Sequence, residues 1–173
     1  TDTKTSPPPT GQDSCRRAAK IVDAGQRSVS HQMHAAKFPV HRDLAGFVFE
    51  GSPVERKLIH TLAELAFTDA AHNVVLVGGP GTGKTHLATA IGVAGITRHG
   101  KRVRFYSTVD LVNALEQEKS QGKAGRIALS LQRMDLVILD ELGYLPFSQA
   151  GGALLFHLLS RLYEQTSVMI TTN

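Results

Sequence analysis

The sequence contains a single cysteine, Cys15, so it cannot form a disulfide bond within the chain. Cysteine and histidine do not recur with the spacing of zinc ligands, which argues against a zinc site. No apolar run approaches the roughly 20 residues that a membrane helix needs. The segment Thr1–Ser6, followed by Pro7–Pro9, lacks the apolar core of a signal peptide. These absences favour a protein of the reducing cytoplasm that has no membrane partner.

The distribution of charge divides the chain into a basic head and a neutral body. With 173 residues and 42% hydrophobic content, the chain can bury a sizeable core, and we expect one globular unit. Of 19 basic and 15 acidic residues, seven and three lie in residues 1–42, which leaves twelve of each beyond. A basic arm suggests contact with a polyanion such as DNA, and a solvated tail is the alternative. Residues 1–26 are rich in threonine and proline, so we expect them to be disordered.

A glycine-rich segment, residues 78–85, fits the phosphate-binding pattern G-x-x-x-x-G-K-[ST] at every fixed position. Residues 73–77 before it are short and apolar, as in a buried parallel strand, and residues 86–91 after it have helical composition. Such a loop directs backbone N–H groups and a helix N-terminus at an anion. We therefore expect nucleotide to contact Gly78, Gly79, Pro80, Gly81, Thr82, Gly83, Lys84, Thr85 and His86.

Two residues of this segment have specific expected roles. Lys84 is expected to reach the β- and γ-phosphates, and the hydroxyl group of Thr85 is expected to bind Mg²⁺. For His86, local packing or capping is favoured over a part in catalysis. A plain glycine-rich turn is the alternative interpretation, but such a turn does not need Lys-Thr at this offset. The segment predicts ATP and Mg²⁺ as ligands.

A second apolar stretch, Leu136–Leu139, runs directly into two carboxylates, Asp140 and Glu141. The carboxyl end of a central strand is where open α/β sheets bind ligands. We expect Asp140 to complete the Mg²⁺ site opposite Thr85, and Glu141 to polarise the water that attacks the γ-phosphate. An apolar run that ends in two acids is weak evidence alone, but Asp140 follows Lys84 by 56 residues, which leaves room for one βα unit. Together the two segments predict a nucleoside triphosphatase.

The remaining apolar pattern predicts alternating helices and strands. Ser52, Pro53 and Glu55 predict a helix start with a capping box, and an apolar stripe follows at Val54, Leu58, Leu62 and Leu65. Other helices are expected after the glycine loop as far as His99, through 108–115, around 127–131 and over 149–164. The expected strands are 73–77, 103–107, 136–141 and 167–172, and residues 143–146 form a loop. This order predicts an α/β fold of the P-loop NTPase type, a parallel sheet with helices on both faces.

Three motifs resemble one known family. They are residues 78–88, Asp-Glu-Leu-Gly-Tyr-Leu-Pro at 140–146 and Thr-Thr-Asn at 171–173. All three are similar to the IstB-like ATP-binding proteins of insertion sequences, AAA+ ATPases related to the DnaC helicase loader. The resemblance covers roughly residues 27–173 and implies that Asn173 is sensor 1, which acts with Glu141 and Lys84 in catalysis. It divides the chain into a head (1–26), an extended or helical lead-in (27–51) and an AAA+ core (52–173).

The chain departs from this family at its C-terminal end. The family pattern continues with a fifth strand, an arginine finger and a helical lid, whereas this chain stops at Asn173. We therefore expect a truncated or rearranged transposon product, an incomplete core without the last strand and lid. The resemblance implies a sheet order of 5-1-4-3-2, so the strand before the glycine loop is expected to be an exposed apolar edge, which favours aggregation.

The resemblance implies an ATPase that assists DNA transposition in the cytoplasm. Its implied partners are DNA, the transposase of the same element and a homo-oligomer, which the truncation is expected to impair. Two alternatives stay open: a helicase loader of the DnaC type, and a non-hydrolysing remnant that binds nucleotide or DNA. Whether this chain turns ATP over is also left open.

Overall fold

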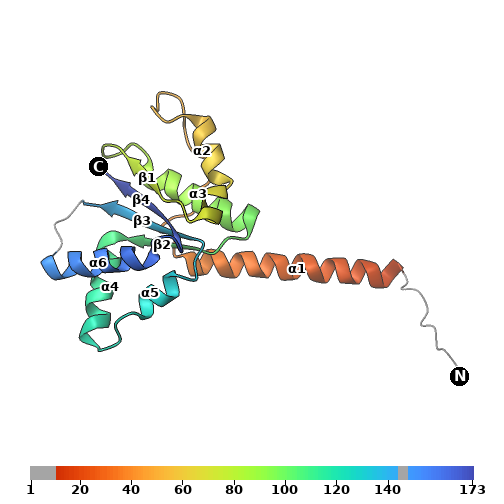
Figure 1. Cartoon of the computed structure of the whole chain (residues 1–173). Helices are drawn as coiled ribbons and strands as arrows, with labels where there is room; N and C mark the ends of the chain where they lie inside the picture. Colours follow the sequence, from red (N-terminus) through yellow and green to blue (C-terminus); the bar gives the residue numbers. More distant parts are fainter. Residues whose placement is uncertain (1–10, 144–147) are drawn as a thin grey trace, which may run out of the picture.

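The computed structural model describes residues 11–143 and 148–173 (Figure 1). The elements in chain order are α1 (Gly11–Ala36), α2 (Arg56–Ala63), the 3₁₀ helix η1 (Ala66–Ala70), β1 (Val74–Val77), α3 (Lys84–His99), β2 (Val103–Ser107), α4 (Thr108–Ser120), α5 (Arg126–Leu131), β3 (Leu136–Leu142), α6 (Gln149–Leu162) and β4 (Ser167–Thr172). The first ten residues of the expected head, and residues 144–146 of the expected loop, lie outside the described residues.

The four strands form one parallel sheet in the order β1-β4-β3-β2. Helical crossovers connect them, so the carboxyl ends of the central strands meet at one edge of the sheet. This confirms the parallel α/β fold, and β3 includes both carboxylates as predicted and ends one residue later, at Leu142. β1 is an outer strand, and the Val75 and Val77 side chains are 54% and 70% exposed. The expected apolar edge is therefore present in the described structure.

Helices cover both faces of the sheet (Figure 1). On one face, α1, α2 and α3 pack with Ile138 and Met169 in a buried cluster. On the other face, α4, α5 and α6 pack with Val137 and Leu139. Neighbouring residues of β3 thus enter opposite cores, as the alternation of a strand requires. A Cβ atom at Gly92 of α3 would lie 2.9 Å from the Ile138 side chain, so this glycine lets α3 lie close against the sheet.

The N-terminal region differs from the prediction, because α1 begins within the segment that we expected to be disordered. The proline run ends at Pro9, and residues 11–36 contain no proline and several good helix formers. α1 projects from the body at its N-terminal end (Figure 1). At its other end Val29 and Met33 pack against the core and Ala36 is fully buried. The disorder prediction was wrong for residues 11–26, since the threonine and proline content of the first ten residues does not extend into the helix.

Helix α2 also differs, because it begins at Arg56 instead of at the predicted capping box. The Ser52 hydroxyl accepts a hydrogen bond from the backbone N–H of Val54 at 3.3 Å, while Glu55 makes no side-chain cap. Ile59 and Ala63 of this helix are buried, whereas Leu58 of the predicted stripe is 53% exposed. Leu62 and Leu65 of the predicted stripe do pack in the core, so the stripe is confirmed in part and the buried face also includes Ile59 and Ala63.

Candidate nucleotide-binding site

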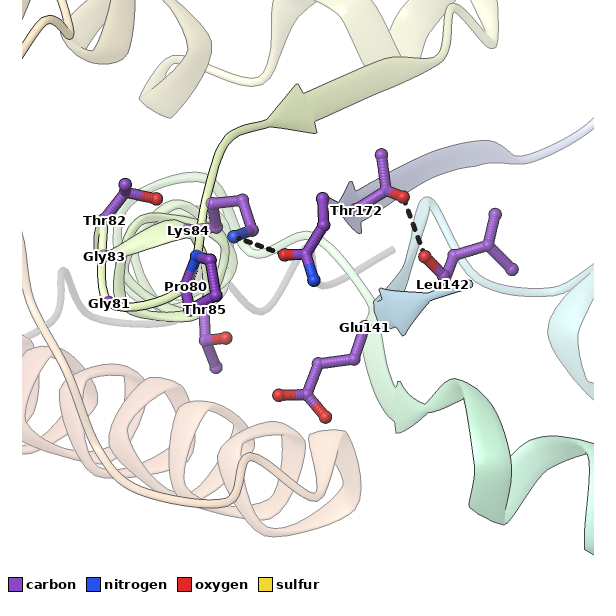
Figure 2. Close-up of a pocket in the computed structure, with 10 residues that line it drawn as sticks. Pro80, Gly81, Thr82, Gly83, Lys84, Thr85, Glu141, Leu142 and Thr172 are labelled. Carbon is purple, nitrogen blue, oxygen red and sulfur yellow. Dashed lines mark hydrogen bonds between the residues drawn. The ribbon is translucent and has the colours of Figure 1, made fainter. Parts of the chain in front are cut away.

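A cavity of about 410 Å³ opens where β3 and β4 end and α3 begins (Figure 2). This volume lies within the range of roughly 300–1,000 Å³ that is usual for small-ligand sites. The cavity is lined by Pro80, Gly81, Thr82, Gly83, Lys84, Thr85, Glu141, Leu142, Thr172 and Asn173. The fold thus brings together three segments that the sequence analysis predicted separately: the glycine loop, the acidic end of β3 and the end of β4.

The loop between β1 and α3 has the backbone conformation of an anion cradle. Gly81 and Gly83 have φ angles of +74° and +85°, in the left-handed region that favours glycine. α3 begins at Lys84, so its unpaired N-terminal N–H groups lie at the cavity. A Cβ atom on Gly83 would lie 2.6 Å from the Phe47 ring. The lead-in therefore packs directly on the phosphate loop, and the shape of this loop fits a nucleotide phosphate.

The side chain of Lys84 crosses the cavity to the end of β4. Its Nζ atom donates hydrogen bonds to the backbone oxygens of Gly78 and Gly79, the second at 2.8 Å. It also donates to Asn173 Oδ1 at 3.2 Å (Figure 2). Two residues predicted to act together in catalysis, separated by 89 positions in the chain, are thus in direct contact.

Asp140 and Thr85 form a second contact between the two predicted motifs. The Thr85 hydroxyl lies 3.0 Å from both carboxylate oxygens of Asp140. The Asp140 carboxylate lies near the buried end of β3, and the residue is only 6% exposed. A carboxylate and a hydroxyl supply the hard oxygen ligands that Mg²⁺ prefers, and Mg²⁺ usually completes its shell with water and substrate phosphates. The donor set therefore fits this ion, although no group of three or more His, Cys, Asp or Glu side chains gathers within the described residues.

Glu141 lies in the cavity wall with a backbone conformation that is rare for a residue other than glycine. Its φ angle is +62°, and its side chain points into the open space of the cavity (Figure 2). Its backbone N–H donates to Thr171 Oγ1 at 2.8 Å, and Thr171 Oγ1 donates to Asp140 Oδ1 at 2.6 Å. Thr171 belongs to the Thr-Thr-Asn motif, but no role was predicted for it. Its signal in the sequence is a polar residue directly after the apolar run Val168–Ile170 of the same strand.

His86 does not line the cavity, although it was included in the predicted nucleotide segment. Its Nε2 atom lies 3.0 Å from the backbone oxygen of Asp43. Its ring meets the Phe47 ring edge to face, with 5.4 Å between the centroids. Phe47 in turn packs against Phe49, also edge to face. The local packing role that we favoured for His86 is the one that the structure has, because its side chain points toward the lead-in.

Comparison with known proteins decides the family. The family model for the IstB-like ATP binding protein matches residues 18–173. The chain belongs to this family. It is 38% identical over 149 residues to the ATP-binding protein of insertion sequence IS21 from Pseudomonas aeruginosa, which covers 86% of this chain and 56% of the relative. This IstB-like chain thus spans little more than half the length of that relative.

Solved structures place the IstB-like chain in the AAA+ P-loop fold. The crystal structure of the DnaC helicase loader matches it with a TM-score of 0.61 and 25% identity, over 68% of this chain and 67% of that one. AMPPCP-bound DnaA from Aquifex aeolicus matches with a TM-score of 0.63 and 22% identity, over 79% of this chain and 44% of that one. The likeness to DnaA concerns the fold alone. None of the described helices has the length and apolar character needed to cross a membrane.

Proposed function

We propose that this IstB-like protein binds ATP with Mg²⁺ in the cavity and hydrolyses it in support of DNA transposition. The observation that carries the proposal is the meeting of two contacts in one cavity. The Lys84–Asn173 contact joins the glycine loop to the end of β4, and the Thr85–Asp140 contact joins it to the end of β3. A plain structural turn needs neither contact.

Each residue of the cavity has a proposed role. The backbone of residues 78–83 cradles the phosphates, and Lys84 contacts the β- and γ-phosphates after releasing its present carbonyl partners. Thr85 and Asp140 hold Mg²⁺, which when bound neutralises charge that develops on the phosphates. Glu141 polarises the attacking water, and Asn173 donates a hydrogen bond to this water or to the γ-phosphate. The exposed carboxylate of Glu141 suits a group that must reach water in the cavity.

The biological setting of the proposal comes from relatives. The Pseudomonas relative is named as an ATP-binding protein of an insertion sequence, which supports transposition and a transposase of the same element as partner. The structural likeness to the DnaC helicase loader supports a second candidate, loading of a replicative helicase. Affinity purification of the chain from its host separates the two: recovery of transposase supports the first, and recovery of helicase supports the second.

DNA is the proposed polyanionic partner, with α1 and its flanks as the contact region. Residues 1–42 hold seven of the 19 basic residues and three of the 15 acidic ones, and α1 projects from the body (Figure 1). Binding through such a region falls steeply with salt, because each neutralised phosphate releases counterions. Fluorescence anisotropy with a DNA duplex at increasing salt tests this contact. Affinity that is unchanged by salt, or by removal of residues 1–26, contradicts it.

The decisive test of the catalytic assignment is Glu141→Gln, which keeps the size of the side chain but cannot take up a proton. We expect this variant to bind ATP as the wild type does and to lose turnover by about 10²–10⁴-fold. Glu164→Gln, which changes an exposed glutamate beyond α6, is the matched control. Nucleotide titration and steady-state phosphate release measure the two quantities. Turnover by Glu141→Gln at the wild-type rate refutes the role of Glu141, and a wild type that binds without turnover supports the non-hydrolysing alternative.

A further inference from the structure

We propose that Thr171 is a positioning residue that sets the arrangement of both acidic groups, Asp140 and Glu141. Its hydroxyl group accepts a hydrogen bond from the backbone N–H of Glu141 and donates one to the carboxylate of Asp140. The inference rests on the proposed function, which assigns the role of metal ligand to Asp140 and that of general base to Glu141. The inference adds Thr171, which lies on β4 and contacts neither nucleotide nor metal in its assigned role.

The first step of the argument is an irregularity in the pairing of β3 with β4. Leu139 pairs with Ile170 and Leu142 pairs with Thr172, so two residues of β3 face the single residue Thr171 of β4. This is a β-bulge, a feature that re-aims side chains and is frequent beside active sites. In a regular strand, Asp140 and Glu141 would point to opposite faces of the sheet. The bulge and the positive φ angle of Glu141 allow both carboxyl groups to lie at the carboxyl end of β3, where the cavity opens.

The second step concerns the hydrogen bonds that a bulge removes. Because the ladder is interrupted, the backbone N–H of Glu141 has no regular partner on β4, and the Thr171 hydroxyl accepts it at 2.8 Å. The same hydroxyl then donates its proton to Asp140 Oδ1 at 2.6 Å. A hydroxyl group has one proton to donate, so these two bonds fix its orientation. Thr171 therefore couples the strained backbone of Glu141 to the carboxylate of Asp140.

The third step is burial, which gives these bonds their strength. Thr171 is 1% exposed and Asp140 is 6% exposed, so water does not readily replace a lost partner. Neighbouring threonines hold the backbone of the bulge: Thr108 Oγ1 donates to the backbone oxygen of Asp140 at 2.8 Å, and Thr172 Oγ1 donates to that of Leu142 at 2.7 Å. Thr171 differs from both because it contacts the carboxylate itself. Its loss should therefore disturb the chemistry of the site, and not only the stability of the strand.

The test compares Thr171→Val, which removes the hydroxyl at nearly constant shape, with Thr171→Ser, which keeps it. Thr89→Val is the matched control, because Thr89 is fully buried and its hydroxyl has no hydrogen-bond partner among the described residues. Three quantities are measured on the full chain: hydrogen exchange of the Glu141 amide without nucleotide, the Mg²⁺ concentration that half-saturates binding of a fluorescent ATP analogue, and kcat against KM for ATP. The amide measurement needs neither ATP nor Mg²⁺, so it tests the bridge independently of the proposed function.

We expect Thr171→Val to raise the exchange rate of the Glu141 amide and the half-saturating Mg²⁺ concentration by about tenfold or more each. We expect kcat to fall by more than KM changes, because the groups affected act on Mg²⁺ and water and leave the phosphate loop intact. Thr171→Ser should restore all three values, and Thr89→Val should leave them at the wild-type level.

The proposal is overturned if Thr171→Val keeps the wild-type amide exchange and Mg²⁺ requirement, or if Thr171→Ser is as impaired as Thr171→Val. Thr171→Ala removes the hydroxyl by a second route and replaces the valine variant if valine disturbs folding. If the wild type binds no ATP·Mg²⁺, the proposed function fails. The exchange of the Glu141 amide still decides, in that case, whether the hydroxyl bridge exists.

Discussion

Replacement of Lys84 by alanine is the most direct perturbation of the candidate site. The residue begins α3, and its Nζ atom lies between the glycine loop and Asn173 at the cavity. Alanine is a good helix former, so the change should leave α3 in place and remove only the side-chain contacts. We therefore expect the variant to fold as the wild type does and to bind ATP more weakly.

The magnitude follows from the partners that Lys84 exchanges. A hydrogen bond to a charged group contributes about 1.5–3 kcal/mol, and ATP offers such a bond through its phosphates. To form it, Nζ must leave the backbone oxygens of Gly78 and Gly79 and the side-chain oxygen of Asn173. Gly79 is exposed, so water satisfies its oxygen afterwards, but the exchange still cancels part of the gain. We expect a net loss in the lower part of the range, about 1.5–2 kcal/mol, which is roughly a tenfold to thirtyfold increase in Kd.

Titration of folded protein with a fluorescent ATP analogue in Mg²⁺ measures this loss. Lys123→Ala is the matched control, because it removes the same charge from an exposed residue outside the cavity. Circular dichroism establishes that both variants keep the wild-type helix content. Equal Kd values for wild type and Lys84→Ala refute the assignment of the cavity to nucleotide phosphates. Equal losses in Lys84→Ala and Lys123→Ala would instead indicate a general effect of net charge.

Three further predictions concern the stability and association of the fold. Gly83→Ala should lower the free energy of unfolding by about 1–2 kcal/mol, because the backbone of residue 83 is in the left-handed region and an added Cβ atom would meet the Phe47 ring. Adding Phe47→Leu should recover only the part of this loss that comes from the steric contact. Thermal melting of the two variants measures both effects. Partial burial raises the pKa of Asp135, but hydrogen bonds from the Arg102 side chain and backbone outweigh it and lower this pKa. The resulting stabilisation is fully present above about pH 4 and is lost as the pH falls through the lowered pKa, so Asp135→Asn should cost more stability in urea at pH 7 than at pH 3; equal costs would contradict this. Val77→Lys should reduce self-association of the chain in light scattering, since a charge on an exposed strand edge opposes pairing, and unchanged association would place the contact elsewhere.

The local parts of the site were predictable because their signals are contiguous in the sequence. The glycine loop must present backbone N–H groups within a few residues, so its pattern of glycine, lysine and threonine identifies it without knowledge of the fold. The run of apolar residues into Asp140 and Glu141 is likewise legible, since a buried strand and its polar end are neighbours in the chain. The parallel sheet followed from the alternation of such strands with helical segments. The resemblance to a family added Asn173, which no pattern of its own identified.

Tertiary contacts decided the rest. The bulge opposite Thr171 arises from the pairing of two strands that are about 30 residues apart, and no local pattern specifies a pairing register. α2 begins at Arg56 because packing against α3 outweighs capping preferences that are worth only about 1 kcal/mol. The C-terminal part of α1 is positioned by tertiary contacts, because Val29 and Met33 pack against a core that the rest of the chain supplies. Sequence alone thus predicted which groups would bind phosphate and metal, whereas the pairing of strands and the packing of helices determined how these groups face one another.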